Sequence, residues 1–209
     1  MKKMTQEDIL NIYKKAGALL EGHFELSSGL HSPAYLQSAL VLQYPEYASM
    51  LCKELAEVFK DRKIEVVIAP ALGGIIVAHE VARHLNVRAI FAERENGQLT
   101  LRRGFRIEEG ERTLVVEDVI TTGISVKETI DVVEKSKGML VGVGSLIDRS
   151  GGKAEIGHTY HSLVVLNEPV YKPDECPLCK KGQKITKPGS RDLSCPSLFH
   201  SCGAAKDRG

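Results

Sequence analysis

Five short apolar segments alternate with amphipathic segments along the chain, and this alternation constrains the fold more than any other feature. The segments are apolar at successive positions, which is typical of strands buried on both faces. Such strands, separated by helices, form a parallel sheet covered by helices on both sides. We expect strands at 65–69, 88–92, 113–117, 139–147 and 161–166, and helices at 5–16, 45–59, 73–85 and around 130–133.

Composition excludes several classes of protein. Hydrophobic residues make up 43% and charged residues 26%, as in ordinary globular proteins. The net charge of +1 argues against a generally basic nucleic-acid-binding protein. The longest uncharged stretch covers 13 residues, 66–78, and is too short to cross a bilayer. The start carries no apolar segment typical of a secretory signal, so we expect a cytoplasmic protein.

The last part of the chain differs in composition from the rest. From residue 171 onward it has eight basic and four acidic residues, and it is rich in Pro, Gly, Ser and Cys. This tail therefore carries a charge of +4, and residues 1–170 carry −3. We expect one folded domain over 1–170 and a partly disordered, Cys-containing tail over 171–209.

The segment Val115–Ser125 contains the residues with the clearest chemistry. Two carboxylates, Glu117 and Asp118, follow an apolar strand, and we place them at its end. A Thr-Thr-Gly turn then leads into a helix, whose free N–H groups and positive dipole suit a phosphate. Adjacent carboxylates suit the vicinal hydroxyls of a ribose, so the segment predicts a ribose 5-phosphate site. The alternative is a helix-capping turn preceded by solvated acids.

This segment resembles the phosphoribosyl-pyrophosphate (PRPP) signature of the type I phosphoribosyltransferases. Three further segments resemble orotate phosphoribosyltransferases in particular and occur in that family's order. They are the N-terminal hood at 22–35, the pyrophosphate-binding loop at 69–74 and the strand end with an orotate-binding arginine at 144–149. The resemblance implies an α/β fold with a central, mostly parallel sheet flanked by helices. It also implies a small hood at about 1–40, a core at about 41–170 and a long mobile loop.

The resemblance implies a reaction as well as a fold. Orotate and PRPP would give orotidine 5′-monophosphate and pyrophosphate, with Mg²⁺, in pyrimidine biosynthesis. The family's members are homodimers in which the mobile loop reaches the partner's site. No nucleic-acid or membrane partner is expected.

Residue roles are implied position by position. Glu117 and Asp118 would be catalytic groups that hold the ribose hydroxyls and favour the developing positive charge. The implied orotate-binding residues are Thr121, Arg149, Ser28, Gly29 and Tyr35; the alternative for Arg149 is an ordinary surface arginine. The implied PRPP-binding residues are Arg94, Glu117, Asp118, Val119, Ile120, Thr121, Thr122, Gly123, Ile124, Ser125, Ala71, Leu72, Gly73 and Gly74.

Residues 93–112 interrupt the strand–helix pattern with a polar excursion, for which we expect a mobile hairpin. The resemblance implies that basic residues here contact pyrophosphate, and our candidate catalytic cations are Arg102 and Arg103. The segment 71–74 lacks the lysine that many relatives have, so these arginines or Mg²⁺ must neutralise the leaving group. The alternative is a solvated hairpin in which glutamates pair with the arginines.

The tail contains four of the five cysteines. Cys176 and Cys179 form a C-x2-C pair, and Cys195 and Cys202 follow at less regular spacing. In a cytoplasmic chain these four residues are either structural Zn²⁺ ligands or reduced thiols on a loose tail. We interpret His23 and His31, in the hood segment, as structural rather than catalytic.

Two other classes of function stay open. A purine or uracil phosphoribosyltransferase would share the PRPP segment but would not need a carboxylate-binding arginine at position 149. A PRPP-sensing regulator, or a protein that binds nucleic acid through the basic tail, should carry a helix-turn-helix domain or a basic face. The negative charge of residues 1–170 argues against this second class.

Overall fold

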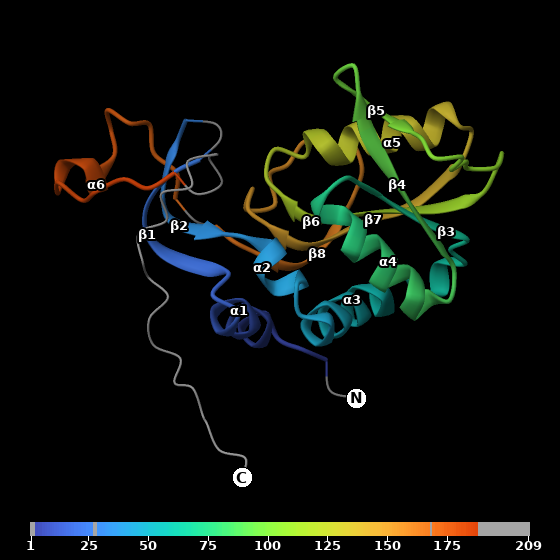
Figure 1. The fold of residues 1–209 in the computed structure, drawn as a ribbon, viewed down its shortest axis with the longest axis horizontal. Coiled ribbons are helices and arrows are strands. Elements are labelled where there is room, and N and C mark those ends of the chain that lie inside the picture. The colour runs from blue at the N-terminus through green and yellow to red at the C-terminus, as the bar shows by residue number, and fades with distance from the viewer. Residues whose placement is uncertain (1–2, 27–28, 168, 188–209) are drawn as a thin grey trace, which may run out of the picture.

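The computed structural model describes residues 3–26, 29–167 and 169–187. Its centre is a six-stranded sheet in the order β5-β4-β3-β6-β7-β8 (Figure 1). All neighbouring pairs are parallel except β4 and β5, which form an antiparallel hairpin. The strands are β3 (Val66–Pro70), β4 (Arg88–Glu95), β5 (Gln98–Leu101), β6 (Arg112–Ile120), β7 (Met139–Asp148) and β8 (His161–Val165).

Both faces of this sheet are buried, as the apolar segments predict. On β3, Val67 packs into one core and its neighbours Val66 and Ile68 into the other, because successive side chains of a strand point to opposite faces. The first core lies under α1, α2, α3 and α4, and the second lies under α5 (Figure 1). These helices are α1 (Gln6–Lys15), α2 (Ser38–Leu42), α3 (Pro45–Phe59), α4 (Gly73–Leu85) and α5 (Ile124–Lys135).

The five expected strands are confirmed as β3, β4, β6, β7 and β8, and the expected helices as α1, α3, α4 and α5. Thr5 caps α1: its hydroxyl accepts from the Asp8 N–H, and the Asp8 carboxylate accepts from the Thr5 N–H. No helix of the described residues is long and apolar enough to span a membrane.

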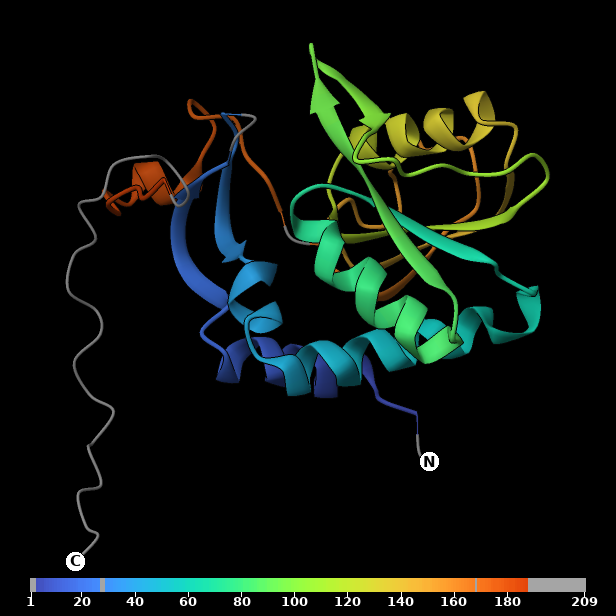
Figure 2. The same cartoon turned by 45° about the vertical axis from the view of Figure 1, so that its right-hand side comes forward.

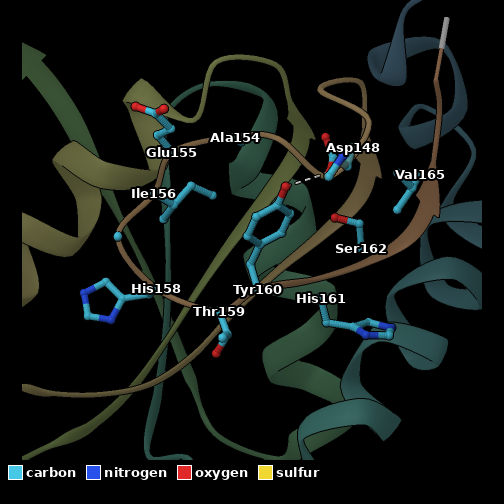
Figure 3. A pocket seen from close by; sticks show the side chains of 12 residues that line it. Asp148, Ala154, Glu155, Ile156, His158, Thr159, Tyr160, His161, Ser162 and Val165 are labelled. Carbon is cyan, nitrogen blue, oxygen red and sulfur yellow. Dashed lines mark hydrogen bonds between the residues drawn. The ribbon is translucent and has the colours of Figure 1, made fainter.

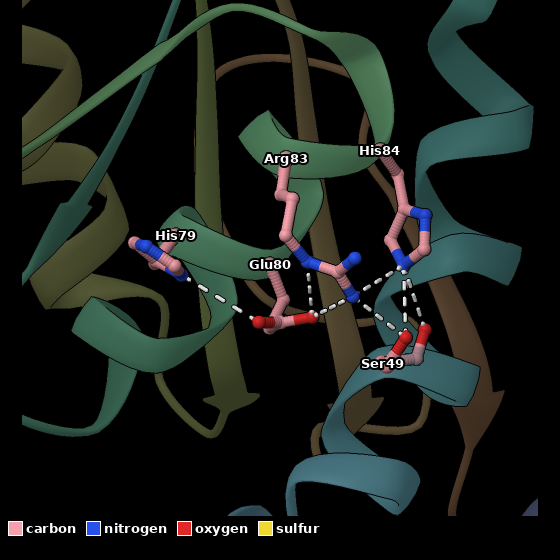
Figure 4. Close-up of polar contacts among 5 residues, drawn as sticks. All are labelled: Ser49, His79, Glu80, Arg83 and His84. Atoms are coloured by element: carbon pink, nitrogen blue, oxygen red, sulfur yellow. Dashed lines mark hydrogen bonds and ion pairs between the residues drawn. The ribbon is translucent and has the colours of Figure 1, made fainter.

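Polar contacts fix α4 against α3 (Figure 4). The Arg83 guanidinium donates to the Ser49 hydroxyl at 2.8 Å and to the Glu80 carboxylate at 2.6 Å. His84 Nε2 lies 3.0 Å from the Ser49 carbonyl oxygen. These contacts tie two helices together at the end of α4 opposite to Gly73, where the helix begins.

The hood is an antiparallel hairpin of β1 (Leu19–Glu25) and β2 (His31–Leu36), separate from the main sheet. The start of the tail, with the short helix α6 (Pro177–Lys180), lies beside this hairpin (Figures 1 and 2). Main-chain bridges join Tyr171 to His31 and Thr186 to Phe24. The described part of the tail is therefore docked on the hood. The division into a domain at 1–170 and a tail at 171–209 stays a prediction.

The excursion at 93–112 begins as the predicted hairpin. β4 and β5 pair antiparallel, and the turn between them is Asn96-Gly97, both at positive φ. The polar pattern of this segment predicts that it lies outside the core, and that is wrong in part. Leu99, on β5, and Ile107, after that strand, are both buried in the core under α5.

Candidate functional site

The site lies where the chain order of the sheet reverses. β4 lies on one side of β3 and β6 on the other, so the carboxyl ends of β3 and β6 flank a topological switch point. Ligands of open α/β sheets bind at such points. The loops that leave these two strands are residues 71–74 and 121–123, both of which the sequence singled out.

The 71–74 loop is in direct contact with the last part of β6. A Cβ atom built on Gly73 would lie 2.7 Å from Oδ2 of Asp118. A Cβ on Gly74 would lie 2.7 Å from the Ala69 Cβ and 3.2 Å from Oε1 of Glu117. A side chain at either position would displace its neighbours, because the backbone passes against the two carboxylates where α4 begins.

The position of these carboxylates corrects one sequence expectation. Glu117 and Asp118 do not follow the strand, because β6 continues to Ile120. The reason is asymmetric pairing. β3 accompanies β6 only as far as Val115, whereas β7 pairs with it up to Ile120. The last part of β6 is therefore a strand with one free edge, and the 71–74 loop lies next to it.

Glu117 is a buried acid. Its side chain is 7% exposed, and Oε1 accepts a hydrogen bond from the Asp118 N–H at 3.1 Å. Burial, followed by the charge of the neighbouring Asp118, raises the pKa of the Glu117 carboxyl well above its ordinary value. A bound hydroxyl donor or cation would stabilise such a buried carboxyl group.

The N-terminus of α5 has the predicted form. Gly123 is the N-cap residue at φ 81°, and a Cβ there would lie 2.8 Å from Ile156 Cγ1. Thr121, Thr122 and Ile124 are exposed beside it, and the first-turn N–H groups have no acceptor within the helix. This end of α5 can therefore receive an anion. Ile120 points into the core and Val119 is half-buried, so their contribution would come from the backbone.

The 71–74 loop offers fewer N–H donors than its length suggests. The Ala71 N–H already donates to the Ala92 carbonyl at 2.8 Å. The donors that remain belong to Leu72, Gly73 and Gly74 at the start of α4, where a helix has no internal acceptors. The Leu72 side chain is exposed and carries no charge.

Each candidate arginine of the excursion is paired with a glutamate. Arg103 donates to Glu93 at 2.7 and 2.9 Å, and Arg102 lies 3.5 Å from Glu95. Arg94 forms an ion pair with Glu128 on α5. The arrangement is that of a charged hairpin in which glutamates pair with the arginines, the alternative raised from the sequence. A role on pyrophosphate requires these arginines to leave their partners.

Arg149 follows β7, and its N–H donates to the Ile120 carbonyl at 2.8 Å. It therefore lies beside the end of β6, next to Thr121. The preceding Asp148 is buried and accepts a hydrogen bond from the Tyr160 hydroxyl at 2.7 Å (Figure 3). It also accepts one from the Ser150 N–H at 2.6 Å. These bonds hold the chain around Arg149 in place.

Asp148 also lines a groove of about 740 Å³, together with residues of the 152–162 loop and β8 (Figure 3). Among the residues that the structure describes, none of those implied in orotate or PRPP binding lines it. We therefore do not identify this groove as the substrate site.

The next candidates are the hood residues that the resemblance implies in orotate binding. The Gly29 N–H donates to the Leu26 carbonyl at 2.9 Å, so it is already in use. Tyr35 packs against Phe24, with 5.8 Å between ring centroids. Ser28 lies outside the described residues.

The cysteine pair meets partners that sequence reasoning did not assign to it. Cys176 and Cys179 lie beside His23 and His31, and these four side chains could hold a metal ion. The other predicted ligands, Cys195 and Cys202, lie outside the described residues. The sequence does contain a signal for this set, since two histidines occur in the short hood segment. Spacing alone does not connect these histidines to a cysteine pair some 150 residues away.

Comparisons with known proteins identify the family of this chain. The sequence model of the "Phosphoribosyl transferase domain" family matches residues 44–175. The orotate phosphoribosyltransferase of Caldicellulosiruptor saccharolyticus is 58% identical over 190 residues, which cover 91% of this chain and 100% of that protein. The chain belongs to the orotate phosphoribosyltransferase family.

Other relatives are consistent with this assignment. The orotate phosphoribosyltransferase of Pelotomaculum thermopropionicum is 55% identical, with 91% of this chain and 100% of the relative covered. The crystal structure of orotate phosphoribosyltransferase from Aeropyrum pernix matches with a TM-score of 0.62 and 26% identity, over 76% of this chain and 93% of that one.

Proposed function

We propose that this chain transfers the phosphoribosyl group of PRPP to orotate at the switch point between β3 and β6. The observation that carries the proposal is the contact of Gly73 and Gly74 with Asp118 and Glu117. It joins a loop that can receive pyrophosphate to a pair of acids that can receive a ribose. The substrates follow from the family, and this contact supports the switch point as their binding site.

Each group of residues has its own role in the reaction. In the transfer, the bond from C1′ to pyrophosphate breaks and a bond from C1′ to an orotate nitrogen forms. Glu117 and Asp118 accept hydrogen bonds from the ribose hydroxyls, and Asp118 stabilises the positive charge at C1′. The first-turn N–H groups of α5 bind the 5′-phosphate. Arg149, beside Thr121, pairs with the orotate carboxylate.

The leaving group needs positive charge that the 71–74 loop does not supply, because that loop has only N–H donors and no cationic side chain. Mg²⁺ fits this place, since carboxylate and phosphate oxygens are the ligands that it prefers. When bound with PRPP, Mg²⁺ neutralises charge on the departing pyrophosphate. Arg102, Arg103 and Arg94 add to this when the excursion releases them from their glutamates.

We further propose a homodimer in which the excursion acts on the partner's site. A mixed dimer tests this, with Arg103→Ala in one subunit and Asp118→Asn in the other. If the loops act between subunits, one site collects both defects and the other is intact, so activity recovers to about half of wild type. If each loop serves its own subunit, the mixture is as poor as either parent. The cytoplasmic location stays a sequence-based prediction.

The reaction itself is tested by the loss of orotate absorbance in the ultraviolet. Turnover should require both PRPP and Mg²⁺, and product and pyrophosphate should form in equal amounts. Faster use of hypoxanthine or uracil than of orotate would refute the proposal. It would favour a purine or uracil phosphoribosyltransferase.

A further inference from the structure

Four side chains from the hood and the tail converge on one point. Their ligand atoms are His23 Nε2, His31 Nδ1 and the Sγ atoms of Cys176 and Cys179, all within 4.8 Å of one another. The two nitrogens are 3.0 Å apart, and Cys179 Sγ lies 3.4 Å from His31 and 3.7 Å from His23. Cys176 Sγ lies 3.6 Å from His23. Ligands of a tetrahedral Zn²⁺, at their usual bond lengths, are about 3.3–3.8 Å apart.

The outer hydrogen bond of His23 supports a metal-binding role. Its Nδ1 lies 2.8 Å from the carbonyl oxygen of Gln183. A carbonyl oxygen only accepts, so Nδ1 carries the proton and Nε2 turns a lone pair toward the cluster. Metal-binding histidines are commonly oriented in this way by a carbonyl that accepts from the other ring nitrogen.

Burial distinguishes the cluster from a surface coincidence. Cys176 is fully buried, His23 is 3% exposed and His31 is 6% exposed, whereas Cys179 faces solvent. The Cys-Pro-Leu-Cys turn at the start of α6 brings both thiols to the same side. The three sulfur–nitrogen distances given above fit a tetrahedral ion, and two thiols and two imidazoles favour Zn²⁺ over the hard cation Mg²⁺.

The main chain around the cluster also joins the hood to the tail. His31 and Tyr171 exchange backbone hydrogen bonds of 2.8 and 2.9 Å. Thr186 donates to the His23 carbonyl at 2.8 Å and accepts from the Glu25 N–H at 2.9 Å. The tail thus pairs with both strands of the hood hairpin, and the cluster lies where these contacts meet.

We propose that His23, His31, Cys176 and Cys179 bind one structural Zn²⁺ that fastens the tail to the hood. The ligands come from β1, β2 and the two ends of the Cys-Pro-Leu-Cys turn. This set differs from the four cysteines suggested by spacing, because two histidines replace Cys195 and Cys202. The ion is separate from the Mg²⁺ that accompanies PRPP.

Metal analysis of the purified full chain tests the ligand set. We expect about one zinc per chain in the wild type and a loss of most of it in Cys176→Ala and Cys179→Ala. The matched controls are Cys195→Ser and Cys202→Ser, which should retain the metal. Absence of zinc from protein reconstituted with it would overturn the proposal. So would retention in the first pair of variants, or loss in the second.

Cobalt substitution gives an independent readout on the wild type, in case a variant fails to fold. Co²⁺ bound by two thiolates and two imidazoles should show the intense visible bands of a tetrahedral site and a sulfur-to-cobalt charge-transfer band. His31→Cys should keep the tetrahedral bands and strengthen the charge-transfer band, because a thiolate replaces an imidazole. A weak octahedral spectrum without charge transfer would contradict the proposal.

Discussion

The guanidinium of Arg103 donates two hydrogen bonds to the carboxylate of Glu93, on the strand that begins the excursion. Pairing with Glu93 holds the Arg103 guanidinium in its charged form, with a pKa above its ordinary value. The pair lies near the surface, so its contribution to folding is small, and the arginine can exchange Glu93 for a phosphate.

We expect Arg103→Ala to lower kcat/KM for PRPP by about tenfold to a hundredfold, because one charge-assisted contact to pyrophosphate is lost. The matched control is Arg106→Ala, since Arg106 pairs with Glu108 in the same segment but is not a candidate ligand. Steady-state kinetics at saturating orotate measures both variants. Equal losses of kcat/KM in the two variants would mean that Arg103 acts only through the overall positive charge of the loop.

Gly73→Ala should lower activity without unfolding the protein. The new Cβ would lie 2.7 Å from the Asp118 carboxylate, which can swing away because it is the end of a side chain. The fold then survives, but the carboxylate leaves the place where it meets the ribose. We expect a loss of about tenfold or more in kcat/KM for PRPP. The control is Ile76→Ala on the exposed side of the same helix.

A thermal unfolding curve accompanies the kinetics of these two variants. A large fall in the melting temperature of Gly73→Ala, matched by the fall in activity, would show that the contact is needed for folding instead.

Asp118→Asn should reduce kcat by about a hundredfold or more, because it removes negative charge beside the developing cation. The variant keeps the shape of the side chain, so circular dichroism should be unchanged. Asp131→Asn, an exposed acid on α5, is the control and should behave as wild type. Unchanged kinetics in Asp118→Asn would remove this residue from the mechanism.

Glu117 makes stability depend on pH in a defined direction. Its pKa is raised in the folded chain by burial and by Asp118, so the folded state keeps a proton that the unfolded state releases. Its contribution to the free energy of unfolding is therefore full below the ordinary pKa of a glutamate. It is lost as pH rises toward the raised value.

Glu117→Gln should consequently be more stable than wild type in the absence of substrates, and the difference should grow with pH. It should also be less active, since the ribose loses a carboxylate. Urea unfolding at a series of pH values measures the first effect. The control is Glu155→Gln at an exposed position, which should follow the wild-type profile. A difference that shrinks with rising pH would contradict the assignment.

Much of the fold could be predicted from the sequence because its signals are local. The apolar runs define β3, β6 and β7, and capping chemistry at Thr5 begins α1. The hood hairpin is less visible, because buried polar residues such as His23, His31 and Ser32 interrupt the apolar pattern of its strands. The end of β6 was misplaced because its length depends on pairing with β7, which no local pattern encodes.

The sequence by itself determined the alternation of strands and helices, the carboxylate pair and the glycines of two loops, since each depends on a few neighbouring residues. Only the tertiary structure decided what these elements face. It brought Gly73 against Asp118, paired Arg103 with Glu93 and placed His23 and His31 beside Cys176 and Cys179. Those relationships join residues far apart along the chain, and they exist only once the sheet and the docked tail bring the segments together.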